Sequence, residues 1–204
     1  MSESCAIVIM AKAPIAGYAK TRLIPALGAD GAARLAHRML VHVVDEATSA
    51  SMESVYLSCV PDMRHPAFRS FAAIPGLTLC DQGSGDIGER MRHAFDCALS
   101  KYSCALVIGS DAPALDASLM RRARAAISHH DAVFVPAKDG GYVLIALRRA
   151  EPTLFERMAW GTSTVMDATR ERLTRAGMRY AELEPIADID EPESLSSLPA
   201  EWLQ

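Results

Sequence analysis

The sequence predicts one α/β domain, a three-layer αβα sandwich in which helices cover both faces of a mixed, mostly parallel β-sheet. Apolar, strand-like runs alternate with helix-like segments along most of the 204 residues, which is the pattern of this fold class. The runs at residues 6–10 and 104–108 contain no polar residue, as expected for strands buried on both faces of a parallel sheet. Half of the residues are hydrophobic, enough for one full core, so we expect no second domain.

The remaining elements follow from apolar spacing and turn residues. Strands are predicted at residues 6–10, 55–60, 77–80, 104–108, 132–135, 142–147 and 180–183. Helices are predicted at residues 30–49, 66–72, 86–99, 116–127 and 164–176, with a short one after residue 190. Asp86 and Glu89 form a capping-box pattern at the start of the third helix. The link at residues 136–141 is too short for a parallel crossover, so its flanking strands are expected to form a hairpin and make the sheet mixed.

The composition excludes several classes of partner. A net charge of −4 gives no chain-wide attraction to nucleic acid or to an anionic membrane, so any phosphate site must be local. No apolar run has the length of a membrane span, and residues 1–4 lack the basic start of a secretion signal. The five cysteines are scattered and never form a C-x-x-C pair, which favours buried reduced thiols. We therefore expect a cytoplasmic protein without nucleic-acid or membrane partners.

The loop after the first strand is cationic. Lys12, Lys20 and Arg22 lie within eleven residues, and Pro14 and Gly17 prevent the strand from continuing. Because open α/β sheets bind ligands beyond the carboxyl ends of their strands, this position favours a bound di- or triphosphate over a solvated surface loop.

A nucleotide-binding P-loop is a second interpretation of this segment. That motif needs glycine immediately before the lysine and again five residues earlier. Ala19 and Pro14 occupy those positions. The P-loop hypothesis therefore fails, and most kinase hypotheses fail with it.

Aspartates suggest a metal site at the same edge of the sheet. Asp111 directly follows the second fully apolar strand, and Mg2+ is usually held by one or two carboxylates plus substrate phosphate oxygens. A turn-forming role is the alternative. Asp188 or Asp190 would supply a second carboxylate, since alternation along an extended segment points both to one side. Asp190 has a second interpretation as the cap of the final helix.

Glycine-rich turns allow two interpretations each. Gln82, Gly83 and Gly85 lie between a predicted strand and a predicted helix. Backbone atoms without side chains there would contact a base or sugar, or the glycines would only form a tight turn. Residues 140–142 fit either hairpin geometry or close approach to a substrate. Trp160 is more often a core or partner-facing residue than a ligand-stacking one.

Five motifs, taken together and in order, resemble a known family. They are Lys-Ala-Pro-x-x-Gly-x-x-Lys-Thr-Arg-Leu (12–23), Gly-Ser-Asp-Ala-Pro (109–113), Asp-Gly-Gly-Tyr (139–142), Trp-Gly-Thr (160–162) and Asp-Ile-Asp (188–190). Over nearly the whole chain the sequence resembles the bacterial glycosyltransferase-A-like (GT-A-like) proteins grouped with nucleotide-diphospho-sugar transferases. It is more distantly similar to 2-phospholactate guanylyltransferase and to the molybdenum-cofactor nucleotidyltransferases.

The resemblance implies a GT-A-like fold with a sheet of about seven strands and a nucleotide or nucleotide-sugar over its N-terminal half. It implies Mg2+, or Mn2+, on Asp111 and Asp188, and catalytic roles for Lys20, Arg22 and Asp111. Nucleotide contacts would come from Lys12, Gly17, Lys20, Arg22, Gln82, Gly83, Gly85, Asp86 and Gly88. The second substrate, a small phosphorylated or sugar acceptor, would meet Asp139, Gly140, Gly141, Tyr142, Trp160 and Thr162.

One departure from the pattern guides the functional expectation. Glycosyltransferases of this fold usually carry an Asp-x-Asp metal motif, whereas this chain has Ser110-Asp111-Ala112. Two separated aspartates favour nucleotidyl transfer from an NTP to a phosphorylated acceptor, with pyrophosphate release. A glycosyltransferase with an NDP-sugar donor and Asp139 as base, or a non-catalytic nucleotide-binding protein, are the alternatives. A homodimer remains open.

Overall fold

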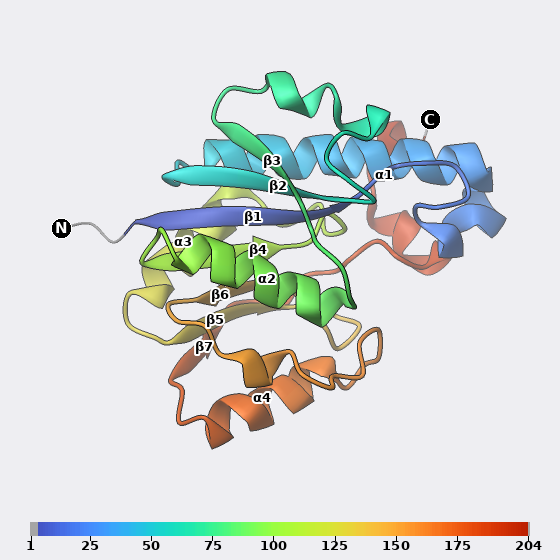
Figure 1. Cartoon of the computed structure of the whole chain (residues 1–204). Coiled ribbons are helices and arrows are strands. Elements are labelled where there is room, and N and C mark those ends of the chain that lie inside the picture. The colour runs from blue at the N-terminus through green and yellow to red at the C-terminus, as the bar shows by residue number, and fades with distance from the viewer. Residues whose placement is uncertain (1–3, 204) are drawn as a thin grey trace.

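Seven strands form one mixed sheet, in the order β3-β2-β1-β4-β6-β5-β7, with helices on both faces (Figure 1). The computed structural model describes residues 4–203. The strands are β1 (Cys5–Lys12), β2 (Ser54–Val60), β3 (Leu77–Asp81), β4 (Cys104–Ile108), β5 (Ala132–Pro136), β6 (Tyr142–Leu147) and β7 (Tyr180–Glu182). The helices are α1 (Ile24–Ser49), α2 (Ile87–Leu99), α3 (Ala117–Ile127) and α4 (Val165–Arg175). The predicted three-layer αβα fold is confirmed.

The direction of β6 makes the sheet mixed. β6 runs antiparallel to both β4 and β5, while β1 is parallel to β2 and β4. The short turn between β5 and β6 leaves no room for a crossover helix, so the two strands pair as the expected hairpin. All the other neighbouring strands are parallel, and their carboxyl ends therefore meet at one edge of the sheet.

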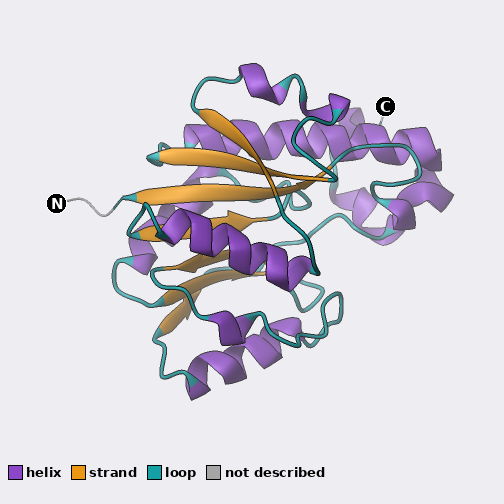
Figure 2. Ribbon diagram, in the orientation of Figure 1, coloured by secondary structure: helices purple, strands orange, loops and turns teal. Residues whose placement is uncertain are grey.

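The sheet lies between helices on its two faces (Figure 2), and its central strand β1 contributes side chains to a core cluster on each face. Ile7 and Ile9 pack into the cluster that contains α1 and α3, whereas Ala6 and Val8 pack into the cluster that contains α2 and α4. This alternation arises because successive strand side chains point to opposite faces. It explains why the run at residues 6–10 is apolar without a break.

Some predicted boundaries differ from the structure. α1 as a whole begins at Ile24, but Gly28, with φ 69° and ψ 166°, separates a short first turn from the long helix that follows. The long helix therefore starts close to the predicted Asp30. The predicted short helix at residues 66–72 is two 3-10 turns, Pro66–Phe68 and Phe71–Ala73. A left-handed backbone conformation at one glycine does not change the spacing of apolar residues, so periodicity does not predict the kink at Gly28.

Gly140 is a point where the fold tolerates no side chain. Its φ is +95°, and a Cβ built there would lie 2.1 Å from the backbone oxygen of Ser163. Gly140→Ala is expected to destabilise the protein by about 3 kcal/mol, because left-handed strain and a backbone clash add. Urea unfolding measures this. Gly109→Ala is the matched control, since a Cβ there meets nothing within 4 Å, and a loss of similar size in that variant would contradict the explanation.

Candidate functional site

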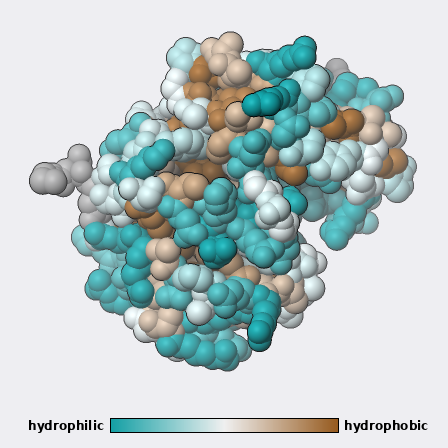
Figure 3. Space-filling view, viewed as in Figure 1, coloured by the Kyte–Doolittle hydropathy of each residue, from teal (hydrophilic) through white to brown (hydrophobic). Residues whose placement is uncertain are grey.

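The principal cleft lies at the carboxyl ends of β1 and β4. The chain passes from β1 to β2, which lies on one side of β1, and later places β4 on the other side of β1. The carboxyl ends of β1 and β4 are therefore the topological switch point, where open sheets bind ligands. The cleft has a volume of about 340 Å³. In Figure 3 the outline of the molecule is indented on the side where these strands end. The polar side chains that line the cleft are Lys12, Lys20, Thr21, Arg22, Gln82, Arg90, Ser110, Asp111 and Asp190.

Lys20 connects the two acidic residues of the cleft. Its Nζ lies 2.7 Å from Asp111 Oδ1 and 2.7 Å from Asp190 Oδ1, and it also donates to the backbone oxygen of Ile189 at 2.7 Å. An ammonium group has three donors, and all three are used. In this arrangement Lys20 holds the carboxylates in place and has no donor left for a phosphate.

The backbone and burial of Lys20 are unusual for a lysine. Its φ of 48° places it in the left-handed region, which non-glycine residues adopt at a cost of about 1–3 kcal/mol. The side chain is only 5% exposed. Burial acts to lower the pKa of Lys20, but the carboxylates of Asp111 and Asp190 outweigh it, so the pKa lies above its ordinary value.

The raised pKa of Lys20 predicts how its contribution to stability depends on pH. A lysine whose folded-state pKa is raised stabilises the fold fully below its unfolded-state value and loses that effect as pH rises through the folded-state value. We expect the difference in unfolding free energy between wild type and Lys20→Met to be constant near neutral pH and to shrink only above about pH 10.5. Urea unfolding at several pH values measures it, and a difference that disappears by pH 9 would contradict it.

The second carboxylate at the cleft is Asp190, one of the two residues expected to accompany Asp111, whereas Asp188, the partner that the resemblance implied, does not line the cleft. Asp190 shares the ammonium of Lys20 with Asp111, and the backbone oxygen of Asp111 accepts a hydrogen bond from Ile189 N at 2.8 Å. Asp190 does not cap the last helical segment, Pro192–Ser197, whose N-cap is Glu191. No strand forms at residues 188–190, so the strand-like alternation that was expected to point both aspartates to one side is absent there.

Asp188 lies close to the same site without sharing Lys20. Burial raises the pKa of Asp188, and the neighbouring Asp139 raises it further. The two carboxylates therefore create a region of negative potential beside Asp190.

Three further cations line the cleft. Lys12 Nζ lies 4.0 Å from the ring centroid of Tyr18, and Arg22 Nη1 pairs with Glu191 Oε1 at 3.0 Å. The third is Arg90, which reaches the cleft from the first turn of α2. Its Nε is buried without a hydrogen-bond partner. Sequence analysis missed Arg90, although its position one turn into the predicted helix at residues 86–99 was an available signal.

The glycine-rich turn before α2 has folding roles in the structure. Gln82 lines the cleft, but its Nε2 donates to the backbone oxygens of Ala11 and Ser58 at 2.9 and 2.8 Å, tying the ends of β1 and β2 together. Asp86 caps α2 in a capping box with Glu89. The other expected nucleotide contacts in this region, Gly83, Gly85 and Gly88, do not line the cleft.

Close packing explains two of these glycines. A Cβ on Gly85 would lie 2.1 Å from Glu89 Oε2, and a Cβ on Gly88 would lie 2.6 Å from Trp160 Nε1. Gly17 has φ 75° and also lies outside the cleft lining. The structure therefore gives Gly85 and Gly88 packing roles, and it gives Gly17 and Gly83 a backbone role, since both have positive φ values. That these glycines contact a nucleotide stays a prediction.

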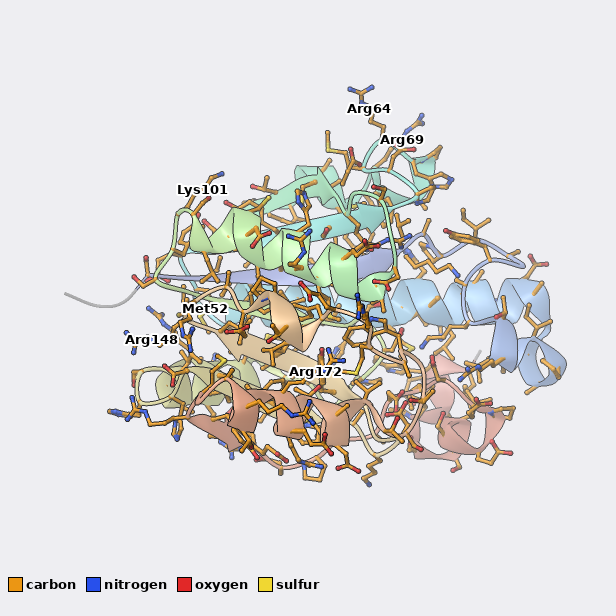
Figure 4. The ribbon with its side chains drawn as sticks, turned by 60° about the horizontal axis from the view of Figure 1, so that its bottom comes forward. Met52, Arg64, Arg69, Lys101, Arg148 and Arg172 are labelled. Atoms are coloured by element: carbon orange, nitrogen blue, oxygen red, sulfur yellow. The ribbon has the colours of Figure 1, made fainter. Side chains whose placement is uncertain are left out.

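A second pocket adjoins the cleft and shares Met10, Ile87 and Asp190 with it. Five of the six residues expected to meet a second substrate line this pocket, namely Asp139, Gly141, Tyr142, Trp160 and Thr162. Gly140 instead packs against Ser163. Arg172 of α4 fixes the segment before Trp160, donating hydrogen bonds to the backbone oxygens of Thr153 and Glu156 (Figure 4).

The donor set at Asp111 and Asp190 suits a hard divalent cation. Each carboxylate contacts Lys20 through Oδ1, and the side chains are 48% and 43% exposed. Among residues 4–203, no group of three or more His, Cys, Asp or Glu side chains is arranged to bind a metal ion. Mg2+ commonly takes one or two carboxylates and completes its shell with water and phosphate oxygens, so two carboxylates beside a phosphate site fit it.

The fold and the cleft together define the class of this protein, an α/β domain with the fold of the nucleotide-diphospho-sugar transferases. The chain belongs to the family described as "Uncharacterized protein conserved in bacteria (DUF2064)", whose model matches residues 43–162. The family resemblance expected from the five motifs is confirmed. No curated protein matches the sequence.

Solved structures extend the comparison. A protein from Desulfovibrio desulfuricans G20, provisionally described as a nucleotide-diphospho-sugar transferase, is 32% identical over 94% of this chain and 84% of that one, with a TM-score of 0.84. CMP:2-keto-3-deoxy-manno-octonic acid synthetase complexed with CTP is 12% identical over 95% and 96% of the chains, with a TM-score of 0.61. A Mycobacterium tuberculosis H37Rv protein complexed with manganese is 14% identical over 96% and 97%, with a TM-score of 0.58. The last two share the fold only.

The structure also bears on the expected absence of a membrane span. None of the helices within residues 4–203 has both the length and the apolar character needed to cross a bilayer. The five cysteines are all free, and Cys97 is exposed rather than buried. That exposure follows from its position on the outer face of α2, where apolar context in the sequence gave no warning.

Proposed function

We propose that this protein is a divalent-metal-dependent transferase that binds the phosphates of a nucleotide donor in the cleft between β1 and β4. The observation that carries the proposal is the pairing of Asp111 and Asp190 on Lys20, with Lys12, Arg22 and Arg90 lining the same cleft. Carboxylates for a metal and cations for phosphates occur here together at a topological switch point. The expected roles of Lys12, Arg22 and Asp111 are retained, and the second metal ligand becomes Asp190.

Each residue has a distinct task in this proposal. Asp111 and Asp190 would hold Mg2+ or Mn2+, which supplies Lewis-acid stabilisation of the charge that develops on the leaving phosphates. Lys12, Arg22 and Arg90 bind and orient the phosphate chain, and their fixed positive charge favours the transition state over the ground state. Lys20 is a positioning residue, because it contacts the carboxylates through all of its donors.

Two versions of the transfer fit this site. In nucleotidyl transfer, an acceptor phosphate oxygen forms a bond to the α-phosphorus of an NTP, and pyrophosphate leaves with the electron pair of the broken P–O bond. In glycosyl transfer, an acceptor hydroxyl oxygen forms a bond to the sugar carbon, its proton passes to Asp139, and the nucleoside diphosphate leaves. The second version has specific support from Asp139 in the adjoining pocket and from the D. desulfuricans protein.

Nucleotide binding is the first test of the proposal. Thermal unfolding is followed with each nucleoside triphosphate and with common NDP-sugars, in the presence and absence of Mn2+. A ligand at a hundred times its Kd adds about 2.7 kcal/mol of apparent stability. We expect a metal-dependent rise in the Tm of the protein with at least one donor. Product analysis then separates the versions, since only nucleotidyl transfer releases pyrophosphate. A protein that binds a nucleotide but never turns it over would support the non-catalytic alternative.

Arg90 offers a selective test of the phosphate site. Arg90→Gln is expected to weaken binding of the stabilising nucleotide by about 10–100-fold, because a charged hydrogen bond to phosphate contributes roughly 1.5–3 kcal/mol. Isothermal titration measures the change. Arg92→Gln on the same helix is the control, since Arg92 pairs with Asp96 in solvent and should leave affinity unaltered. Equal affinities for the Arg90 variant and wild type would remove Arg90 from the site.

A further inference from the structure

The second pocket carries information about the molecule that would occupy it. Its volume is about 320 Å³, and it opens into the nucleotide cleft through the shared residues Met10, Ile87 and Asp190. Under the proposed function, on which this inference rests, a molecule in this pocket therefore lies directly beside the phosphates of the donor.

The walls of the pocket are mainly apolar. Met91, Val107, Ile145 and Val165 reach it from α2, β4, β6 and α4. Tyr142 and Trp160 add two rings in an edge-to-face arrangement with centroids 6.4 Å apart, and Ile87 is unusually exposed for its size, at 39%. Such walls favour a ligand with an apolar or ring-shaped face, because removal of apolar surface from water on both partners drives binding.

The charges of the two cavities are opposite in character. Lysines and arginines line the nucleotide cleft, but no lysine, arginine or histidine among the described residues lines the second pocket. Its charged groups are Asp139 and Asp190. Lys20 pairs with Asp190 and has no donor left to offer. An anion placed beside Asp139 would therefore meet a carboxylate, with no cationic side chain in the pocket wall to pair with it.

Trp160 contributes its ring rather than its N–H group to the pocket. Trp160 lines the second pocket, but its Nε1 is buried without a hydrogen-bond partner and lies against Gly88, where a Cβ would be 2.6 Å from it. Gly88 does not line the pocket. The ring is therefore the part of Trp160 that is available to a ligand, and it adds to the apolar character of the walls.

We propose that the second pocket selects an uncharged or cationic acceptor with an apolar or ring face, and excludes the phosphorylated acceptor expected from the sequence. The acceptor's hydroxyl or amine faces Asp139, and its apolar or ring face packs against the rings of Tyr142 and Trp160. This assignment favours glycosyl transfer over nucleotidyl transfer to a phosphate.

A matched series of probes tests the charge preference. Benzyl alcohol, benzylamine and benzyl phosphate share one ring and differ in the charge of the head group. Each is titrated into the full-length, 15N-labelled protein, and the indole N–H signal of Trp160 is followed by NMR. The chain has two tryptophans, so Trp202→Phe assigns the signal. We expect the alcohol and the amine to perturb Trp160 and to bind at least about tenfold more tightly than the phosphate.

Two variants sharpen the result. Asp139→Asn removes a charge but keeps the oxygen that accepts a hydrogen bond from Gly141 N, and should reduce the affinity for benzylamine relative to that for benzyl alcohol. Asp96→Asn, on the exposed pair with Arg92, should leave it intact. Tightest binding by benzyl phosphate, or no response of Trp160 to any probe, would overturn the inference. Failure of nucleotides to raise Tm, with probe binding intact, would instead defeat the proposed function alone.

Discussion

Asp111→Asn is expected to reduce turnover by about 10²–10³-fold with little loss of stability. The amide keeps the shape of the carboxylate and one oxygen toward Lys20, so the fold is preserved. It lacks the charge needed to hold a divalent cation against the phosphates. Initial rates with the donor identified by thermal shift measure the first effect, and urea unfolding measures the second.

The matched control for this variant is Asp96→Asn. Asp96 is also a partly exposed aspartate in an ion pair, with Arg92 at 3.2 Å, but it lies outside the cleft lining. Its turnover should equal that of wild type. Full turnover in Asp111→Asn would show that the carboxylate has no part in the reaction.

Lys20→Met is expected to affect stability and activity together. Removing the ammonium leaves Asp111 and Asp190 facing one another without a shared cation. Breaking a fully buried pair costs about 3–5 kcal/mol, but these carboxylates are nearly half exposed, so we expect a loss of about 2–3 kcal/mol. For a chain of this size the loss corresponds to roughly 4–12 °C in Tm.

Metal titration distinguishes two causes of lost stability in Lys20→Met, namely repulsion between the carboxylates and poor packing. A divalent cation between Asp111 and Asp190 would relieve their repulsion, so Mn2+ should raise Tm more in Lys20→Met than in wild type. In Asp111→Asn the same addition should have little effect. If Mn2+ stabilises wild type and the Lys20 variant equally, Lys20 does not act through the carboxylate pair.

Local chemistry made much of the fold predictable. The unbroken apolar runs that became β1 and β4 indicated central strands, because strands covered on both faces have no polar side. Asp86 was recognised as a helix cap from its side-chain chemistry, and the helix predicted at residues 116–127 starts with Asp116. Both aspartates accept a hydrogen bond from the backbone N–H three residues on. The short link before Tyr142 indicated the hairpin.

The sequence also indicated that several of the predicted site residues would lie at one edge of the sheet, and they line one cleft in the structure. Lys12, Lys20 and Asp111 all follow strands that the sequence placed in the sheet centre, and parallel strands bring their carboxyl ends together. The sequence did not predict which side chains each of these residues contacts. Arg90 enters the cleft only because of the angle at which α2 packs on the sheet, and periodicity carries no information about that angle.

The sequence by itself determined the fold class, which strands are followed by charged residues, and the edge of the sheet at which cations and carboxylates gather. These features depend on apolar spacing and on residues adjacent along the chain. Only the tertiary structure decided that Asp190 joins Asp111 on a buried lysine, and that no lysine, arginine or histidine of the described chain, residues 4–203, lines the adjoining pocket. The contacts of Lys20 with Asp111 and Asp190 join residues 91 and 170 positions apart, and their geometry depends on how whole elements pack.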